Sequence, residues 1–112
     1  GSNVDDNIIS QNTGDKSVKV FVVDSSHLRF YIAGVENPDI TVKEGDSVRI
    51  VFSSSEGFHD WVVDEFNART DQIKAGGESS VEFVADKKGT FEYYCSVGQH
   101  RVNGMKGKLI VV

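Results

Sequence analysis

The sequence is poor in sulfur and in proline, with one Cys, one Met and one Pro among its 112 residues. A single Cys cannot form an internal disulfide, so no disulfide framework stabilises the fold. No apolar run approaches the roughly 20 residues of a membrane-spanning helix. Basic residues are outnumbered by acidic ones, 12 to 17, and the net charge of −5 argues against nucleic acid as a partner. The composition, 38% hydrophobic and 26% charged, is that of a soluble globular protein.

A chain of this length predicts a single domain, because one hydrophobic core is the usual solution at this size. Residues 1–16 are polar with little periodicity and predict a flexible N-terminal tail, which leaves residues 17–112 as the domain. The chain starts Gly1-Ser2 without an initiator Met. We therefore expect these two residues to be a cloning remnant. The sequence is compatible with a signal peptide or membrane anchor upstream in the natural chain.

The remainder of the chain is predicted to form β-strands. Its apolar segments are short, rich in Val, Ile, Phe and Tyr, and bounded by Gly, Asp, Asn or Ser, which is typical of strands and turns. The predicted strands cover residues 17–23, 39–42, 47–53, 59–63, 79–85, 90–95 and 107–112. Seven or eight short strands at this spacing predict an all-β fold, an antiparallel Greek-key β-sandwich whose two sheets close on one core.

Alternation along the strands predicts which side chains are buried. Val48, Ile50 and Phe52 share one face, which we expect to point into the core. The same alternation turns Cys95 inward at the end of a later strand. No long helical period occurs, and residues 64–77 are expected to form a loop with at most one helical turn.

Both sulfur-containing side chains lie in one stretch, CSVGQHRVNGM, which runs from Cys95 to Met105. His100 lies between them with four residues on either side, and Gly98 and Gly104 allow the backbone to turn tightly. Cys, His and Met can therefore turn toward a common point at one end of the sandwich. The alternatives are an inert buried thiol, an exposed His and a Met that only fills the core.

A thiolate, an imidazole and a thioether form a soft ligand set. Such a set favours copper, in particular a trigonal site of two His and one Cys with a weak axial Met, whereas zinc makes little use of a thioether. A second His is then required from a distant part of the sequence. His59, at the start of the predicted strand 59–63, shares a face with Trp61 and Val63 and is expected to turn toward the core.

These features resemble the plastocyanin/azurin family of blue copper proteins, the cupredoxins. The segment TVKEGDSVRIVFSSSEGFHDWVV is similar to the family's strand, Gly-Asp turn, second strand and first-ligand segment. The segment GTFEYYCSVGQHRVNGMKGKLIVV is similar to its ligand loop and terminal strand. The resemblance covers roughly residues 17–112 and implies a cupredoxin-like domain with one copper ion that cycles between Cu(I) and Cu(II).

The resemblance implies the ligands residue by residue. His59, Cys95 and His100 would be the three strong equatorial ligands, and Met105 would be the weak axial ligand. His100, on the loop at the end of the sandwich, would also be the ligand through which electrons enter and leave. No further cofactor and no catalytic residue is expected.

Other residues are assigned around this site. Relatives often carry Asn after the first His, whereas this chain carries Asp60, which we expect to accept a hydrogen bond from the Ser96 hydroxyl and to lower the reduction potential. Tyr94 alternates to the face opposite Cys95, and in relatives that position can offer a second electron exit. The alternative is an amphipathic Tyr on the outer sheet face. His27 matches no ligand position and is expected to be a surface residue.

The implied function is that of a soluble one-electron carrier, which is not an enzyme. Its partners would be redox proteins that bind transiently to a monomer, at the apolar end around Val97, Gly98 and Val102. One alternative is redox chemistry at the copper on nitric oxide or nitrite, although three His residues cannot build the second copper centre that most such enzymes require. Copper storage or delivery is another alternative, which the lack of Met-rich and His-rich tracts disfavours.

The resemblance also implies a location. Known members of the family work outside the cytoplasm, so we expect a periplasmic or cell-surface setting, in which a longer precursor can tether the domain to a membrane. The acidic residues are spread along the chain. The acidic charge is therefore expected to form a generally solvated surface, with a weaker indication of a cationic partner.

Overall fold

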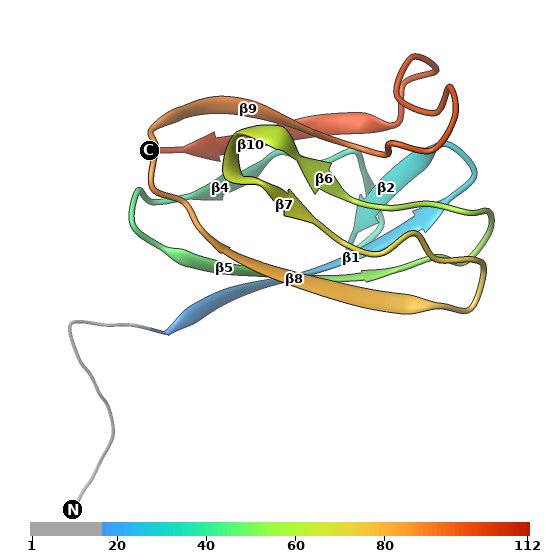
Figure 1. The fold of residues 1–112 in the computed structure, drawn as a ribbon, viewed down its shortest axis with the longest axis horizontal. Coiled ribbons are helices and arrows are strands. Elements are labelled where there is room, and N and C mark those ends of the chain that lie inside the picture. Colours follow the sequence, from blue (N-terminus) through green and yellow to red (C-terminus); the bar gives the residue numbers. More distant parts are fainter. Residues whose placement is uncertain (1–16) are drawn as a thin grey trace, which may run out of the picture.

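The computed structural model describes residues 17–112, which form a sandwich of two five-stranded β-sheets (Figure 1). The tail predicted for residues 1–16 lies outside the described residues. The strands of the described part are β1 (Val18–Ser26), β2 (Arg29–Ile32), β3 (Val35–Glu36), β4 (Ile40–Val42), β5 (Ser47–Ser53), β6 (Val62–Val63), β7 (Ala68–Arg69), β8 (Glu78–Val84), β9 (Gly89–Tyr94) and β10 (Lys106–Val111). The predicted all-β sandwich is confirmed, but the predicted number of seven to eight strands is wrong, since the described residues form ten.

The additional strands are short and leave little trace in the sequence. β2 and β3 form a hairpin across Ala33 and Gly34, whose φ angles of 49° and 80° are both positive. Positive φ at both central residues is what a type I′ turn requires, and Asn-Gly would indicate it more clearly than Ala-Gly does. β7 pairs with β6 and contains two residues, which is too few for alternation to be recognised.

The two sheets are mixed. One has the strand order β3-β2-β1-β5-β8, and the other has the order β4-β10-β9-β6-β7. Most neighbours are antiparallel, but β1 runs parallel to β5 and β4 runs parallel to β10, so the prediction of a purely antiparallel sandwich is wrong for these two pairs. In each pair the intervening chain visits the opposite sheet, and this long connection lets the second strand return in the direction of the first.

The core lies between the sheets. The burial predicted for β5 is confirmed, since Val48, Ile50 and Phe52 are fully buried. From the opposite side of the core come Trp61, which directly precedes β6, and Tyr93 of β9, whose rings stack with their centroids 5.6 Å apart. Burial of large apolar side chains stabilises the fold by about 1.5–3 kcal/mol each.

The single helical turn expected within residues 64–77 is present, but the prediction of a loop is wrong for residues 68–69, which form β7. This turn is a 3-10 helix, η2 (Asp64–Phe66), and it ends at Asn67, whose φ of 50° is left-handed. β7 and an extended loop follow. None of the helices in residues 17–112 is long and apolar enough to cross a membrane.

The backbone of β10 passes close to the Tyr93 ring at Gly107. A Cβ atom at this position would lie 2.3 Å from the Oη and Cζ atoms of Tyr93. We expect Gly107→Ala to displace the ring, to break the 2.6 Å hydrogen bond from the Tyr93 hydroxyl to the Pro38 carbonyl, and to lower the free energy of unfolding by about 1–3 kcal/mol. Lys108→Ala, on the outer side of the same strand, should change it by less than about 0.5 kcal/mol. Urea unfolding of both variants is the test, and equal losses would contradict the close approach.

Candidate metal centre

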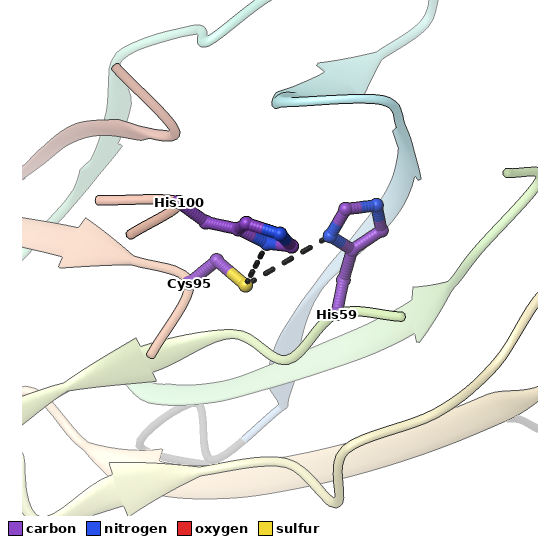
Figure 2. A group of neighbouring side chains, drawn as sticks. All are labelled: His59, Cys95 and His100. Atoms are coloured by element: carbon purple, nitrogen blue, oxygen red, sulfur yellow. Dashed lines mark hydrogen bonds between the residues drawn. The ribbon is translucent and has the colours of Figure 1, made fainter. Parts of the chain in front are cut away.

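Three of the side chains predicted as metal ligands converge at one end of the sandwich. One donor atom from each of His59, Cys95 and His100 lies within 4.8 Å of the other two. Cys95 Sγ is 3.8 Å from His59 Nδ1 and 3.4 Å from His100 Nδ1. The two imidazole rings have their centroids 5.0 Å apart. Figure 2 shows both rings turned toward the Cys95 sulfur, so the three donors face a common point.

Two of these donors come from the loop between β9 and β10, at the end of the sandwich opposite the C-terminus (Figure 1). Cys95 directly follows β9 and is fully buried. Its N–H donates to the Met105 carbonyl at 3.2 Å, and the Met105 N–H donates to the His100 carbonyl at 3.0 Å. Main-chain hydrogen bonds therefore close this ligand loop at its base.

Met105, the fourth predicted ligand, is brought to the same end of the fold. It directly precedes β10, and its side chain is fully buried as part of the hydrophobic core, to which Cys95 also belongs. Its main chain is bonded to that of both Cys95 and His100. The residue is thus held beside the other two predicted ligands of the loop.

A carbonyl group sets the orientation of the His59 ring. The Nε2 atom lies 2.8 Å from the Glu56 carbonyl oxygen, and a carbonyl oxygen can only accept a hydrogen bond. Nε2 must therefore carry the proton. This leaves the lone pair of Nδ1 directed toward Cys95, as a metal ligand requires.

Gly57 leaves the space that the ring occupies. Its φ is 95°, and a Cβ atom at this position would lie 2.5 Å from His59 Nε2. Any side chain at this position would push the ring away from the Glu56 carbonyl. The sequence shows a glycine two residues before His59, but only the folded loop reveals this contact.

The main chain around His59 is hydrogen-bonded to residues of the segment 64–77, which was predicted only as a loop. The His59 N–H donates to the Ile73 carbonyl at 2.9 Å, and the Ile73 N–H donates back at 2.8 Å. The Trp61 N–H donates to the buried hydroxyl of Thr70 at 3.0 Å. Because a side chain takes the place of a strand partner here, the prediction of a strand over residues 59–63 is wrong for its first three residues, and only the last two form β6.

A buried carboxylate joins the two segments that carry the predicted ligands. Asp60 is fully buried and accepts hydrogen bonds from the Ser96 N–H at 2.6 Å and the Ser96 hydroxyl at 2.5 Å. The hydroxyl contact was expected from the sequence, and the amide contact is additional. The Arg69 guanidinium lies 4.0 Å from the same carboxylate. Two donors and a nearby cation compensate for the loss of hydration of this group.

Burial changes the acid–base behaviour of two predicted ligands. It raises the pKa of the Cys95 thiol and lowers the pKa of His59, because surroundings of low polarity disfavour the charged form of each. The hydrogen bond with the Glu56 carbonyl acts in the opposite direction on His59, but the effect of burial is larger. His59 is therefore held neutral with a free lone pair, and the Cys95 thiol keeps its proton until a cation replaces it.

The two predicted electron exits differ in exposure. His100 is partly exposed. Tyr94 points to the opposite side of β9 from Cys95, but it is only 8% exposed, because the Arg101 guanidinium lies 3.6 Å from the centroid of its ring. The Tyr94 hydroxyl donates to Asp64 at 2.6 Å, and this hydrogen bond raises the pKa of Tyr94.

His27 lies outside the centre as a surface residue, as expected. Its Nε2 atom is 2.5 Å from the Glu56 carboxylate, and both side chains are largely exposed. Glu56 thus contacts His27 through its side chain and His59 through its carbonyl. Three residues that hold this segment were missed in the sequence: Glu56 and Ile73 contact His59, and Thr70 contacts Trp61. Each acts through a contact between irregular segments, for which the sequence contains no periodic signal.

The converging donors suit a soft metal ion. Two imidazole nitrogens and one sulfur favour copper or zinc, whereas hard cations such as Mg²⁺ require oxygen ligands. The carboxylate beside the centre, Asp60, is already engaged by Ser96. A trigonal arrangement of two His and one Cys, with a buried Met beside it, is that of a type 1 copper site.

Fold and site together define a β-sandwich protein with a metal centre of two His and one Cys. The sequence matches the family model of the cupredoxin-like domain over residues 7–111. The chain therefore belongs to the cupredoxin-like domain family. Comparison with curated proteins gives no significant match.

Solved structures with the same fold include two auracyanins and a rusticyanin. Auracyanin A, a "blue" copper protein from the green thermophilic photosynthetic bacterium Chloroflexus aurantiacus, matches with a TM-score of 0.71 and 19% identity over 86% of this chain and 100% of its own. Auracyanin from the photosynthetic bacterium Roseiflexus castenholzii matches with a TM-score of 0.70 and 22% identity, over 88% of this chain and 99% of its own. Reduced rusticyanin matches with a TM-score of 0.69 and 21% identity, over 89% of this chain and 82% of its own. These matches confirm the predicted fold class.

The family assignment predicted from the sequence is confirmed by the family match. The predicted cofactor, one copper ion, is the one that this family and the observed donor set support.

We expect Gly57→Ala to displace the His59 ring from the Glu56 carbonyl. Gly45→Ala is the matched control, since Gly45 has a similar φ of 93° but no atom within 4 Å of an added Cβ. Both variants should lose at least about 1 kcal/mol of unfolding free energy through backbone strain. Only Gly57→Ala should shift the His59 ring resonances in NMR spectra and weaken copper binding by about tenfold or more. Unchanged His59 resonances in this variant would contradict the contact.

Proposed function

We propose that this protein is a type 1 copper protein that carries single electrons between redox partners. The observation that carries the proposal is the convergence of His59 Nδ1, Cys95 Sγ and His100 Nδ1 on one point. These side chains would be the equatorial ligands, and the buried Met105 would be the weak axial ligand. When bound, the copper ion supplies a centre that accepts and releases one electron.

The surrounding chain favours fast electron transfer because protein contacts fix the positions of the donors. The main chain of His59 is bonded twice to Ile73, and its ring is held by the Glu56 carbonyl. Cys95 and Met105 are joined through their main chains. Donors that cannot rearrange toward the geometry preferred by either oxidation state keep the reorganisation on electron transfer small.

The exposed edge of the centre supports His100 as the point where electrons enter and leave. His59 and Cys95 are buried, whereas His100 is partly exposed. Val102 of the same loop is 78% exposed, and Phe58, next to His59, is 47% exposed. Exposed apolar side chains on a small end face support transient docking of redox partners to a monomer.

Tyr94 is the second proposed exit. It directly precedes Cys95 in the chain, but the Arg101 guanidinium covers its ring. This cover supports His100 as the principal route and Tyr94 as the lesser one.

The single converging group of ligands in the described residues is compatible with electron transfer at one copper ion. Residues 17–112 contain one group of three or more converging metal-ligating side chains, whereas most enzymes of this chemistry need a second copper centre. The family resemblance supports a periplasmic or cell-surface setting. In that setting residues 17–112 would be the copper domain and residues 1–16 its N-terminal tail.

Addition of Cu(II) to the metal-free protein should produce an intense thiolate-to-copper absorption band in the visible range. The band should saturate at one equivalent, because the chain has a single Cys, and Cys95→Ser should abolish it because the thiolate is its source. A visible absorption titration of both proteins is the measurement. No band in the unmodified protein would make Cys95 a structural thiol, and the electron-carrier function would fall with it.

Replacement of Asp60 by Asn should raise the reduction potential. The amide oxygen can still accept from Ser96, but the negative charge that favours Cu(II) is removed. A unit charge several ångströms away contributes about 2 kcal/mol at an effective dielectric constant of about 20, which corresponds to a rise on the order of 100 mV. Asp71→Asn, which removes an exposed charge, is the control and should shift the potential by much less. Redox titration of the visible band tests this, and an equal potential in Asp60→Asn and the parent would refute the electrostatic role.

A further inference from the structure

The carbonyl group that orients the His59 ring belongs to an exposed loop. This loop, residues 53–58, joins the end of β5 to His59, and residues 55–58 are exposed. Phe58 is the one large apolar side chain of the loop, and it is 47% exposed. Burial of apolar surface therefore does little to fix the Glu56 carbonyl, and the position of the loop depends on polar contacts.

The last residues of β1 supply these contacts. The Asp24 carboxylate accepts hydrogen bonds from two loop hydroxyls, that of Ser53 at 3.0 Å and that of Ser55 at 2.6 Å. The next residue, Ser25, is fully buried. Its hydroxyl donates to the Ser53 carbonyl at 2.8 Å, and its own carbonyl accepts from the Ser55 N–H at 2.8 Å. The polar clamp is defined here as Asp24, Ser25, Ser53 and Ser55.

The polar clamp continues the contact between β1 and β5 beyond their paired residues. The parallel register of the two strands ends at Val23, which lies opposite Phe52. From Asp24 onward β1 is paired with β2 instead. Side chains therefore hold the loop where the main-chain pairing has ended, up to an isolated bridge between Ser26 and Glu56.

The side chain of Glu56 adds weaker contacts to the same strand end. Its carboxylate accepts from the Ser26 hydroxyl at 3.1 Å and lies 2.5 Å from His27 Nε2. The side chains of Glu56 and His27 are largely exposed, so this ion pair contributes little. Asp24, in contrast, is half-buried and binds two hydroxyls at once, which makes it the centre of the contacts that hold the loop.

The main chain and the ring of His59 are held by different parts of the molecule. The main chain is bonded to Ile73, whereas the ring is held by the Glu56 carbonyl on the loop that β1 holds. Loss of the polar clamp should therefore leave the His59 main chain in place and release only the ring.

We propose that Asp24 is a positioning residue for the candidate metal centre. Through the hydroxyls of Ser53 and Ser55 it fixes the loop whose Glu56 carbonyl binds Nε2 of His59, and it thereby keeps Nδ1 directed toward the sulfur of Cys95. This inference rests on the proposed electron-carrier function for the identity of the metal alone, because the orientation of the ring is a property of the metal-free chain.

The test compares serine variants that leave the charge of Asp24 in place. Ser53→Ala with Ser55→Ala removes both hydroxyls, whereas Ser53→Thr with Ser55→Thr keeps them. Ser47→Ala with Ser80→Ala is the matched control, because these two serines lie in the same sheet and their hydroxyls have no partner within residues 17–112.

Long-range ¹H–¹⁵N NMR spectra of the metal-free protein give the first measurement. They report which ring nitrogen of His59 carries the proton and how fast that proton exchanges with water. In the alanine pair we expect exchange of the Nε2 proton to be at least about tenfold faster, because the contact with the Glu56 carbonyl opens more often. The ring signals should also move toward the average of the two neutral tautomers. The threonine pair and the control pair should resemble the unmodified protein.

The Cu(I) form gives the second measurement. Transfer of Cu(I) to the chelator bathocuproine disulfonate should be at least about threefold faster in the alanine pair, because a ligand that loses its outer hydrogen bond binds its metal less tightly. Urea unfolding of the metal-free variants is measured alongside. A clamp that served stability alone would lower the free energy of unfolding while the ring signals and the transfer rate stayed unchanged.

His59 ring signals in the alanine pair that match those of the unmodified protein would overturn the proposal, as would equal changes in the alanine and threonine pairs. Ser55→Ala alone, at an exposed position, serves if the double variant does not fold. It should still speed exchange of the Nε2 proton by about threefold, and unchanged exchange would count against the proposal. The ring signals are read without metal, so a shifted ring together with no visible copper band would refute the electron carrier and leave the role of Asp24 standing.

Discussion

Two hydrogen bonds from Ser96 to the buried Asp60 carboxylate set the spacing of the metal centre. His59 and Cys95 are 36 residues apart, and neither lies within one of the named strands. Strand pairing alone therefore cannot fix the distance between their side chains. Asp60 directly follows His59, and Ser96 directly follows Cys95. The hydrogen bonds between Asp60 and Ser96 therefore act one residue away from each donor. The convergence of the donors depends on this contact being kept.

This end of the sandwich departs from the rules that stabilise the rest of the fold. A carboxylate is buried, Gly57 holds a left-handed backbone beside an imidazole ring, and the Trp61 indole N–H is buried without a hydrogen-bond partner within residues 17–112. An unsatisfied buried donor alone costs about 1–3 kcal/mol. Such costs are tolerated where a site requires them, and the regular packing around β5 offsets them. The concentration of these features beside the converging donors is itself a mark of function.

The sequence was sufficient for the features that depend on local pattern and on ligand chemistry. Strict alternation in β5 predicted its buried face, and the soft donors between Cys95 and Met105 predicted the kind of metal. It was insufficient where the structure depends on contacts between irregular segments. The turn of the hairpin at Ala33 has no clear signal in its residues. His59 is held by the Glu56 carbonyl and by main-chain hydrogen bonds with Ile73, which the sequence does not indicate either. The side chain of Arg101 covers Tyr94, which alternation placed correctly on the outer face but could not show to be hidden.

The main-chain hydrogen bonds that close the ligand loop at Cys95 and Met105 continue the pairing of β9 with β10, which begins at Tyr94 and Lys106. Metal retention and the stability of this hairpin are therefore thermodynamically linked. An ion that binds only the closed loop stabilises the folded hairpin by about 4 kcal/mol when its free concentration is about a thousand times its Kd. The same linkage holds in reverse. Fraying that starts at the Val111 end of β10, far from the centre, becomes a route by which the metal is lost.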